Sequence, residues 1–426
     1  MDRRRFFECM LGGSALSIAA LNELNAAVYD NIRSLNLQYQ QSPDGVYWEA
    51  IRKHYAFKDK LIMMNNGTVG PMPTPVFNTL MKYFEVQLTS PVDCYTYLSG
   101  KRDETREKVA QYVNASPDEI AIVRNTTEGM NFIANGLDLK PGDEVLMSDL
   151  EHPGGIHPWR LKEKRYGIKV KEVHIGAPPR DVDEIVSAFE KAITGKTRVI
   201  SISHTIFITG LIAPIKELSE MAHNKGIVVL ADAAHGLGML DLNMHDMGVD
   251  FWCTSPYKWF GAPPEAGVLY VRKDVQDKVW PTTASSGWDT HQSAKKFETL
   301  SQRADPLILA LGEAVEFQKQ IGKKRIARRI QTMSSFLREE LGKIPRVRLH
   351  TNKDSYLAAG LTAFSIEGVD PQYMVDYLRE KYNIVIRTIG SDAKGTRGVR
   401  VSTNIFVSLK NVETLLEGIH YLARTA

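Results

Sequence analysis

The sequence predicts an α/β fold in which a mostly parallel sheet is covered by helices on both faces, with a smaller α+β domain toward the C-terminus. Two observations lead to this prediction. Between about residues 118 and 275, short apolar runs rich in β-forming residues alternate with segments of helical period. The apolar runs are nearly continuous, which is typical of strands buried on both faces of a parallel sheet.

Seven apolar runs account for the strands of this sheet. They span Ile120–Val123, Val145–Met147, Lys169–Ile175, Arg198–Ser203, Ile227–Ala231, Asp250–Thr254 and Gly267–Val271. Between most of them, four helices are predicted at Gly129–Gly136, His157–Arg165, Asp183–Ile193 and Pro214–Asn224. Gly226 follows the last of these helices and is a typical helix stop before a strand.

The pattern changes after about residue 300. A long helical stretch at Pro306–Gly342 precedes a mixture of strands and one helix, predicted at Arg346–His350, Leu361–Ile366, Pro371–Lys381 (the helix), near Ile384–Arg387 and at Gly398–Ser402. We therefore divide the chain into a signal-like segment at 1–28, an N-terminal segment at 29–64 that packs on the small domain, a large domain at 65–300 and a small domain at 301–426.

Composition excludes several classes of protein. The 426 residues include 53 basic and 50 acidic ones, a formal charge of +3, which gives no support for a nucleic-acid partner. The three cysteines, Cys9, Cys94 and Cys253, cannot build a disulfide framework, and Cys253 lies in an apolar run typical of a core. Beyond residue 30, no apolar stretch reaches the roughly 18 residues that a membrane span needs.

The N-terminal segment has the layout of an export signal. Arginines at 3–5 precede an uncharged, mostly small and apolar stretch from Cys9 to Asn22. The arginine pair before two phenylalanines resembles a twin-arginine signal, so we expect a periplasmic or secreted protein that contacts a membrane only through this segment, if it is not removed. Glu23 interrupts the stretch and no A-x-A site precedes Val28, so a basic N-terminal helix of a cytoplasmic protein is the alternative.

Candidate chemistry lies in the loops that follow the strands, because ligands of open α/β sheets bind beyond the carboxyl ends of their strands. Asp232 stands at the end of one strand. It is either a buried partner for a cationic ring nitrogen or a cap of the next helix. Lys258 follows the next strand among aromatic residues. Burial there lowers the pKa of a lysine and suits an amine nucleophile, although a lone lysine is usually a surface residue.

Two further loops complete the pattern. Thr126 and Thr127 stand at the start of a helix, where their hydroxyls and backbone N–H groups either bind an anion or cap the helix. His152 follows another strand and either stacks on a flat ring or is structural. Together the four loops offer a phosphate site, a partner for a ring nitrogen, a stacking group and an amine for an aldehyde, the set that pyridoxal phosphate requires.

The order of these motifs resembles the class V aminotransferase family of pyridoxal phosphate enzymes, which includes isopenicillin N epimerase-like, cysteine desulfurase-like and kynureninase-like proteins. In this chain the motifs read T-T-E-G-x-N, E-H-P, A-D-A-A-H, S-x-x-K-W and R-V-S. The likeness runs from about Asn65 to Leu422. It implies fold type I of the pyridoxal-phosphate-dependent transferases, with pyridoxal phosphate as the cofactor and no metal site.

The resemblance also implies roles toward the cofactor. Lys258 would be the Schiff-base lysine that moves the α-proton, Asp232 would pair with the pyridine nitrogen, and His152 would stack on the ring. His235 would bond the phenolic oxygen or the phosphate. The phosphate itself would be held by Thr126, Thr127, Ser255 and Tyr257.

Substrate and partner contacts follow from the same resemblance. Arg400 would grip the substrate carboxylate, beneath an N-terminal turn that contains Asn66 and Gly67. Trp288, in a kynureninase-like segment, would reach the phosphate of a neighbouring subunit. This implies a homodimer with shared active sites.

Two departures from the family pattern affect the reaction. Ile206 and Phe207 stand where relatives often carry a polar residue, which puts one contact to the phenolic oxygen, and with it the reaction specificity, in doubt. Cysteine desulfurases need a nucleophilic cysteine before the late arginine, but no cysteine follows Cys253 and the loop at Gly390–Gly395 contains none. The usual persulfide route is therefore not expected.

The sequence thus predicts an exported, homodimeric enzyme that acts at Cα of an amino acid or an amino-acid-bearing peptide. We expect transamination first, then epimerisation, then C–S or C–C lyase chemistry. Two remote alternatives are a binding protein that lost catalysis, although Lys258 is present, and a hydrolase with a metal held by Asp232, His235, His245 and Asp250.

Overall fold

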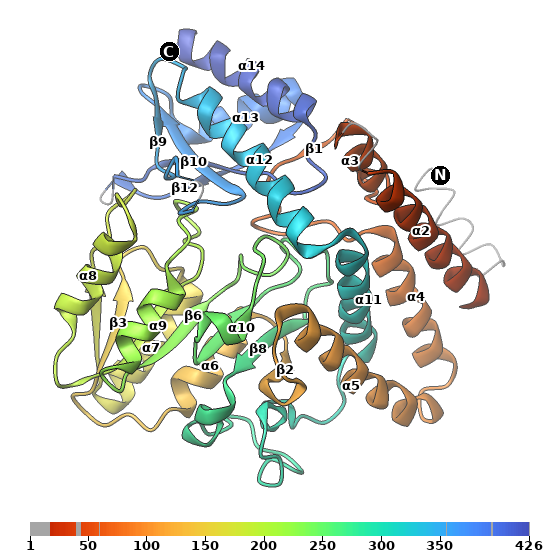
Figure 1. The fold of residues 1–426 in the computed structure, drawn as a ribbon, viewed down its shortest axis with the longest axis vertical. Coiled ribbons are helices and arrows are strands. Elements are labelled where there is room, and N and C mark those ends of the chain that lie inside the picture. Colours follow the sequence, from red (N-terminus) through yellow and green to blue (C-terminus); the bar gives the residue numbers. More distant parts are fainter. Residues whose placement is uncertain (1–17, 40–43, 59, 355, 393–394, 426) are drawn as a thin grey trace.

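The computed structural model describes residues 18–39, 44–58, 60–354, 356–392 and 395–425, and its centre is a seven-stranded sheet (Figure 1). The spatial order of the strands is β2-β8-β7-β6-β5-β3-β4. Their bounds are β2 Ile120–Val123, β3 Glu144–Ser148, β4 Lys169–Val173, β5 Thr197–Ser203, β6 Val228–Asp232, β7 Phe251–Thr254 and β8 Gly267–Val271. β8 runs opposite to the other six strands, which are parallel to one another, so the predicted mostly parallel sheet is confirmed.

Helices cover both faces of this sheet (Figure 1). They are α5 Asp93–Val113, α6 Thr126–Gly136, α7 Pro153–Tyr166, α8 Val182–Ala192, α9 Ile215–His223, α10 Met244–Met247 and α11 Asp305–Ile321, and α4 (Thr74–Thr89) packs against α11 from outside. Successive strand residues point to opposite faces and fill two separate cores. On one face Ile202 and Trp252 pack with α8, α9 and α11, and on the other Leu230 and Phe251 pack with α6 and α7.

The C-terminal part begins with α12 (Lys323–Leu341). The helical stretch predicted at Pro306–Gly342 is two helices, because Gly322 between them has a φ of +99°, which no helical residue adopts. An antiparallel sheet follows, with the order β12-β13-β10-β9. Its elements are β9 Val347–Leu349, β10 Leu361–Ile366, α13 Pro371–Tyr382, β12 Arg387–Ile389, β13 Gly398–Ser402 and α14 Leu409–Thr425. The strand predicted near Ile384–Arg387 is also divided, since β11 (Ile384–Val385) pairs with β1 (Ile62–Met63) instead.

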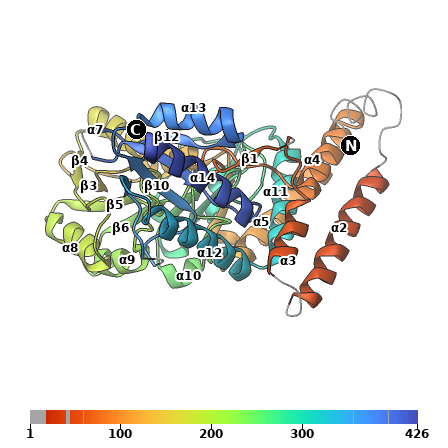
Figure 2. The same ribbon diagram turned by 90° about the horizontal axis from the view of Figure 1, so that it is seen from above.

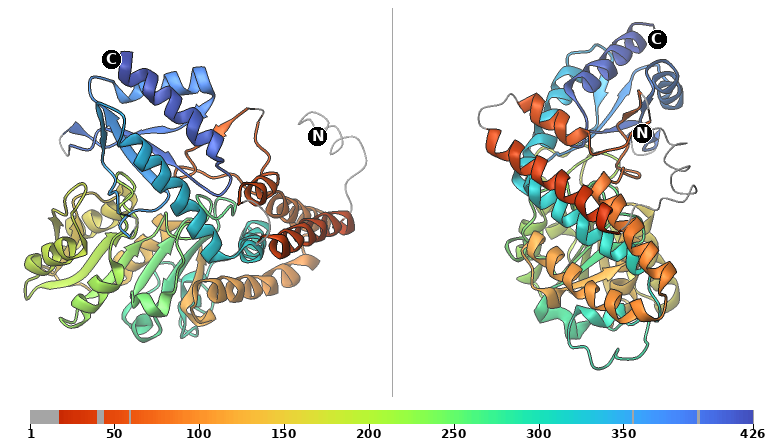
Figure 3. Two further views of the ribbon diagram at one scale, coloured as in Figure 1. Left: turned by 45° about the horizontal axis from the view of Figure 1, so that its top comes forward. Right: turned by 90° about the vertical axis from the view of Figure 1, so that its right-hand side faces the viewer.

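Two N-terminal helices, α2 (Ile18–Gln38) and α3 (Asp44–Arg52), lie at one end of the molecule, far from α8 (Figure 2). Tyr47, Trp48 and Ile51 of α3 share a core with α12, α13 and α14. In contrast, α2 runs along α4 and α11 (Figure 3). The predicted domain boundaries stay predictions, because side chains of α11 belong to both the sheet core and the C-terminal core.

The predicted signal segment is described only in part. Residues 1–17 lie outside the described residues, and residues 18–28 belong to α2. There, Asn25 donates to the Pro75 carbonyl and to Thr79 Oγ1, each at 3.1 Å, and Asn22 accepts from Lys82 at 2.8 Å. Within the described chain, no helix is both long and apolar enough to cross a membrane.

Candidate active site

The predicted amine and carboxylate meet at the carboxyl edge of the sheet. Asp232 is the last residue of β6, and Lys258 lies in the loop that follows the neighbouring strand β7. Asp232 is buried, and desolvation raises the pKa of its carboxyl group, while the nearby Lys258 and His152 oppose that rise. Burial lowers the pKa of Lys258 to about 8, and the charge of Asp232 partly offsets this shift.

Because the ammonium of Lys258 is desolvated, we expect its amine to become reactive near pH 8. Below that pH the amine is protonated, and its rate of modification by acetic anhydride should fall about tenfold per pH unit. The exposed Lys216, whose pKa is raised by its hydrogen bond to Asp246, serves as the internal control. Mass-spectrometric labelling of the protein freed of cofactor measures both, and a midpoint for Lys258 above pH 10 would contradict the account.

The start of α6 supplies an anion site next to these groups. Thr126 donates its backbone N–H to Ser255 Oγ at 3.1 Å, and the two hydroxyl oxygens lie 2.8 Å apart. The backbone N–H of Glu128 donates to Asn125 Oδ1 at 3.1 Å. The N–H of Thr127 has no acceptor within the described part of the chain and is free for a ligand.

His152 stands at the start of α7 and faces the same space. Its Nδ1 accepts the backbone N–H of Gly154 at 3.0 Å, so the proton of the neutral ring is on Nε2. Burial lowers the pKa of His152, which keeps the ring neutral at pH 7. The ring meets Phe207 edge to face with centroids 4.9 Å apart, so Phe207 forms a wall of the site. The adjacent Ile206 is buried in the sheet core.

His235 is held in one tautomer by Trp259. The indole N–H, which can only donate, is 3.0 Å from His235 Nδ1, so the ring proton is on Nε2. Nε2 lies 3.5 Å from the Lys258 amine. Desolvation lowers the pKa of His235 well below its usual range, so the residue presents a neutral N–H donor toward the site.

Arg400 enters the site from β13 of the C-terminal sheet. It is almost fully buried, and one of its nitrogens, Nη1, donates to the Phe207 carbonyl at 2.9 Å. Its Nε and Nη2 have no hydrogen-bond partner in the described part of the chain. Burial lowers the pKa of Arg400 to about 9, and the charge of Arg387 adds to the shift. Two unused donors on one buried guanidinium form a fork that suits a carboxylate.

The turn at 65–70 closes the site from the N-terminal side. Gly67 N–H donates to Ser402 Oγ at 3.2 Å, and Gly70 N–H donates to the Tyr257 carbonyl at 2.8 Å. Asn66 is fully buried, donates to the Lys258 carbonyl at 3.3 Å, and leaves its Oδ1 unpaired. The turn therefore packs on both the lysine loop and the arginine strand.

A side chain at position 67 should disturb this packing. The Cβ of a Gly67→Ala variant would lie 2.8 Å from Arg400 Nη2 and 2.9 Å from Ser402 Oγ, so the guanidinium or the turn must move. We expect KM for carboxylate substrates to rise about tenfold, since small misplacements of a positioning group are costly. Gly45→Ala on α3, where a Cβ meets nothing within 4 Å, is the matched control. Equal KM values for the two variants would contradict this prediction.

The structure does not unite all of the predicted residues. Trp288, which the resemblance places at the phosphate of a neighbouring subunit, is 38% exposed on a loop, and its role stays a prediction. Tyr257 is half-buried and contacts the turn through its backbone. The residues of the metal alternative lie apart, since His245 bonds Glu119 at 2.7 Å and Asp250 bonds His223 at 2.8 Å. Among the described residues, no such group could hold a metal ion.

Sequence reasoning missed three contributors. Trp259 fixes the His235 tautomer, Ser402 anchors the turn, and Arg387 lies opposite Arg400 in the strand pair β12–β13. The sequence carries a signal for Ser402, which ends the R-V-S motif that contains Arg400. The roles of Trp259 and Arg387 depend on contacts between distant segments that a single sequence does not reveal.

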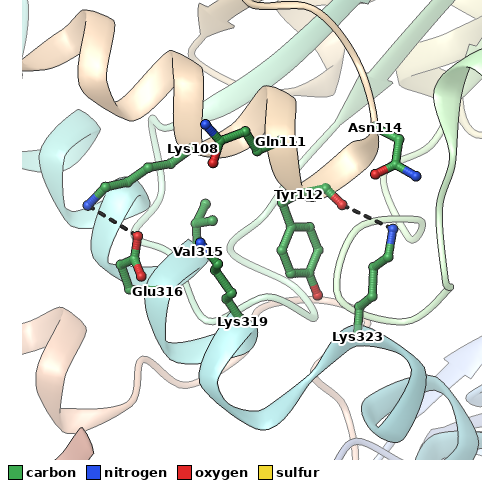
Figure 4. A pocket seen from close by; sticks show the side chains of 8 residues that line it. All are labelled: Lys108, Gln111, Tyr112, Asn114, Val315, Glu316, Lys319 and Lys323. Carbon is green, nitrogen blue, oxygen red and sulfur yellow. Dashed lines mark hydrogen bonds and ion pairs between the residues drawn. The ribbon is translucent and has the colours of Figure 1, made fainter.

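Two hollows are lined mainly by helical residues. A cleft of about 530 Å³ between α6 and α7 reaches Thr127 and Gly154 and so borders the anion site. The other, of about 310 Å³, lies between α5, α11 and α12 (Figure 4). There Lys108 pairs with Glu316 at 3.4 Å, and Lys323 donates to the Tyr112 carbonyl at 3.3 Å. None of the residues that line this hollow belongs to the predicted site.

Known proteins resemble the chain over most of its length. Residues 63–415 match the family described as Aminotransferase class-V. A probable cysteine desulfurase of Methanothermobacter thermautotrophicus is 27% identical over 80% of this chain and 86% of its own. The isopenicillin N epimerase of Streptomyces clavuligerus is 25% identical over 88% of this chain and 98% of its own. A structure of the cystine C–S lyase C-DES with its product cysteine persulfide superposes with a TM-score of 0.76 at 25% identity, covering 84% of this chain and 97% of the lyase.

Proposed function

Because the chain belongs to the aminotransferase class-V family, we propose that this enzyme removes the proton from Cα of an amino acid or amino-acid-bearing peptide, with transamination as its main reaction. The family uses pyridoxal phosphate, which is the cofactor of this chain as well. The observation that carries the proposal is a buried carboxylate, Asp232, next to a desolvated lysine, Lys258, at the ligand edge of the sheet.

The residues present fit this cofactor. The free Thr127 N–H and the Thr126 and Ser255 hydroxyls suit a phosphate. The Asp232 carboxylate is buried with one backbone donor, Ala234 N–H at 3.1 Å, and has capacity left for a protonated ring nitrogen. Gly155 leaves room beside it, since a Cβ there would lie 3.2 Å from Asp232 Oδ2.

When bound, pyridoxal phosphate supplies an aldehyde that combines with amines and a ring that accepts the electron pair left at Cα. Lys258 would be the amine that combines with the cofactor and the base that takes the proton from Cα, because burial lowers its pKa to about 8. Asp232 would pair with the ring nitrogen and favour its protonated form. His235 offers its Nε2–H as a neutral donor, and Arg400 orients the substrate carboxylate through Nε and Nη2.

Epimerisation is the second candidate, supported by the epimerase that matches over 98% of its own length. It shares proton removal from Cα with transamination and differs in where the proton returns. The persulfide route of a cysteine desulfurase lacks support, because both described cysteines are buried. Burial also raises the pKa of the Cys253 thiol well above its usual range, so it is protonated.

One incubation separates these reactions. The holoenzyme is mixed with single L-amino acids and an α-keto acid in D₂O, and keto acids, D-enantiomers and sulfide are quantified by mass spectrometry and chiral chromatography. We expect keto-acid formation that depends on the acceptor. Racemisation without keto-acid release would favour the epimerase, and absence of deuterium at Cα for every amino acid would contradict the proposal.

We further propose a homodimer and export through the twin-arginine route. The exposed Trp288 loop supports a surface for a second subunit. A mass of two chains, measured by light scattering, is expected for the dimer, and a mass of one chain would contradict it.

The contacts of Asn22 and Asn25 with α4 support a mature exported chain that keeps these residues. A reporter fused to residues 1–28 tests export, which should be lost when Arg3 and Arg4 are changed to Lys; export that survives this change would contradict the route.

A further inference from the structure

A second arginine faces Arg400 across the C-terminal sheet. In the antiparallel pair β12–β13, Arg387 is the direct partner of Arg400. Residues directly opposite in such a pair project to the same face, with Cβ atoms about 5 Å apart. Both guanidinium groups therefore leave the sheet on one side.

That side is the one that faces the active site. Ser402, two residues after Arg400, accepts the N–H of Gly67, and Ile389, two residues after Arg387, packs into the core of the large sheet. The intervening Val399 and Val401 point the other way, into the C-terminal core. The guanidinium group of Arg387 lies next to the turn that closes the site, because its Nη1 donates to Thr68 Oγ1 at 3.4 Å.

The two charges are uncompensated. No ion pair to a carboxylate is recorded for Arg387 or Arg400 in the described part of the chain, whereas Arg397 nearby pairs with Asp370 at 2.6 Å. Like charges opposite one another in a sheet are destabilising. The charge of Arg387 also lowers the pKa of Arg400, Lys258 and His152, so it acts across the whole site. An arrangement of this kind is stabilised by a ligand with more than one negative charge.

We propose that Arg387 binds a second carboxylate of the substrate, so that the preferred amino donor is a dicarboxylic amino acid or a peptide that presents an acidic side chain. Arg400 is buried and binds the α-carboxylate. Arg387 is exposed beside the turn that closes the site and binds the side-chain carboxylate. This inference rests on the proposed function, because it assigns the α-carboxylate to Arg400.

The test compares two ligands that differ by one carboxylate. Glutarate and butyrate are titrated into the holoenzyme by calorimetry at 150 mM salt. We expect glutarate to bind at least about tenfold more tightly. Arg387→Gln should bring the ratio close to one with little effect on butyrate, and Arg400→Gln should weaken both ligands. Arg397→Gln, which removes an arginine already paired with Asp370, is the matched control and should keep the ratio of the wild type.

Equal affinities for glutarate and butyrate in the wild type, or an unchanged ratio in Arg387→Gln, would overturn the inference. The proposed function has its own readout in the same preparation, the attachment of the cofactor to Lys258 after borohydride reduction. Attachment together with equal affinities would refute the dicarboxylate preference alone. No attachment would refute the proposed function, and the inference with it.

Discussion

Lys258→Ala should abolish turnover and the visible absorbance of the lysine-bound cofactor. The side chain supplies both the amine and the base, so we expect kcat to fall by roughly 10³-fold or more. The fold should survive, because in the described part of the chain the Lys258 amine has one hydrogen bond, with His235 at 3.5 Å. Absorbance spectra and steady-state rates measure the effect.

A second buried lysine provides the control for this experiment. Lys162 is buried far along α7, where it donates to the Ala134 carbonyl at 2.8 Å, and burial lowers the pKa of its ammonium. Lys162→Met should reduce the melting temperature while leaving the absorbance unchanged. Absorbance that persists in Lys258→Ala, or disappears equally in both variants, would remove Lys258 from its role.

Arg400→Gln should raise KM for amino-acid substrates by about 100-fold or more. The loss of two charge-assisted hydrogen bonds costs roughly 3–5 kcal/mol of binding free energy. Arg400→Lys keeps the charge but lacks the fork, so an intermediate KM is expected. Comparison of KM and kcat shows whether ground-state binding or the transition state is affected.

Burial of Arg400 makes a stability control necessary. Arg338 is equally buried in α12, where it donates to the Ala359 carbonyl at 2.9 Å, and burial lowers the pKa of its guanidinium to about 10. Arg338→Gln should lower the melting temperature without raising KM. An unchanged KM in Arg400→Gln would show that the carboxylate is held elsewhere.

The large sheet could be predicted from the sequence because most of its strands are buried along their length. β2 and β8 match the predicted bounds at both ends, and β7 ends at the predicted Thr254 but begins one residue later than predicted. The site followed from the same pattern, since Thr126, His152, Asp232 and Lys258 each come directly after a predicted strand or within a few residues of it. Parallel strands bring such loops to one edge.

Contacts between distant segments could not be predicted in this way. The pairing of Arg387 with Arg400 depends on strand register, and the tautomer of His235 depends on where the Trp259 indole points. The break at Gly322 was hidden because apolar residues keep a helical period on both sides of it. Packing of α2 on α4 uses asparagine side chains, which carry no periodic signal.

Whether Lys258 is the amine that carries pyridoxal phosphate can be measured by reducing the purified holoenzyme with borohydride and mapping the modified peptide by mass spectrometry. We expect a yellow protein that loses its colour on reduction, with the phosphopyridoxyl group on the peptide that contains Lys258. A cofactor mapped to another lysine, or a colourless protein that pyridoxal phosphate cannot reconstitute, would contradict it.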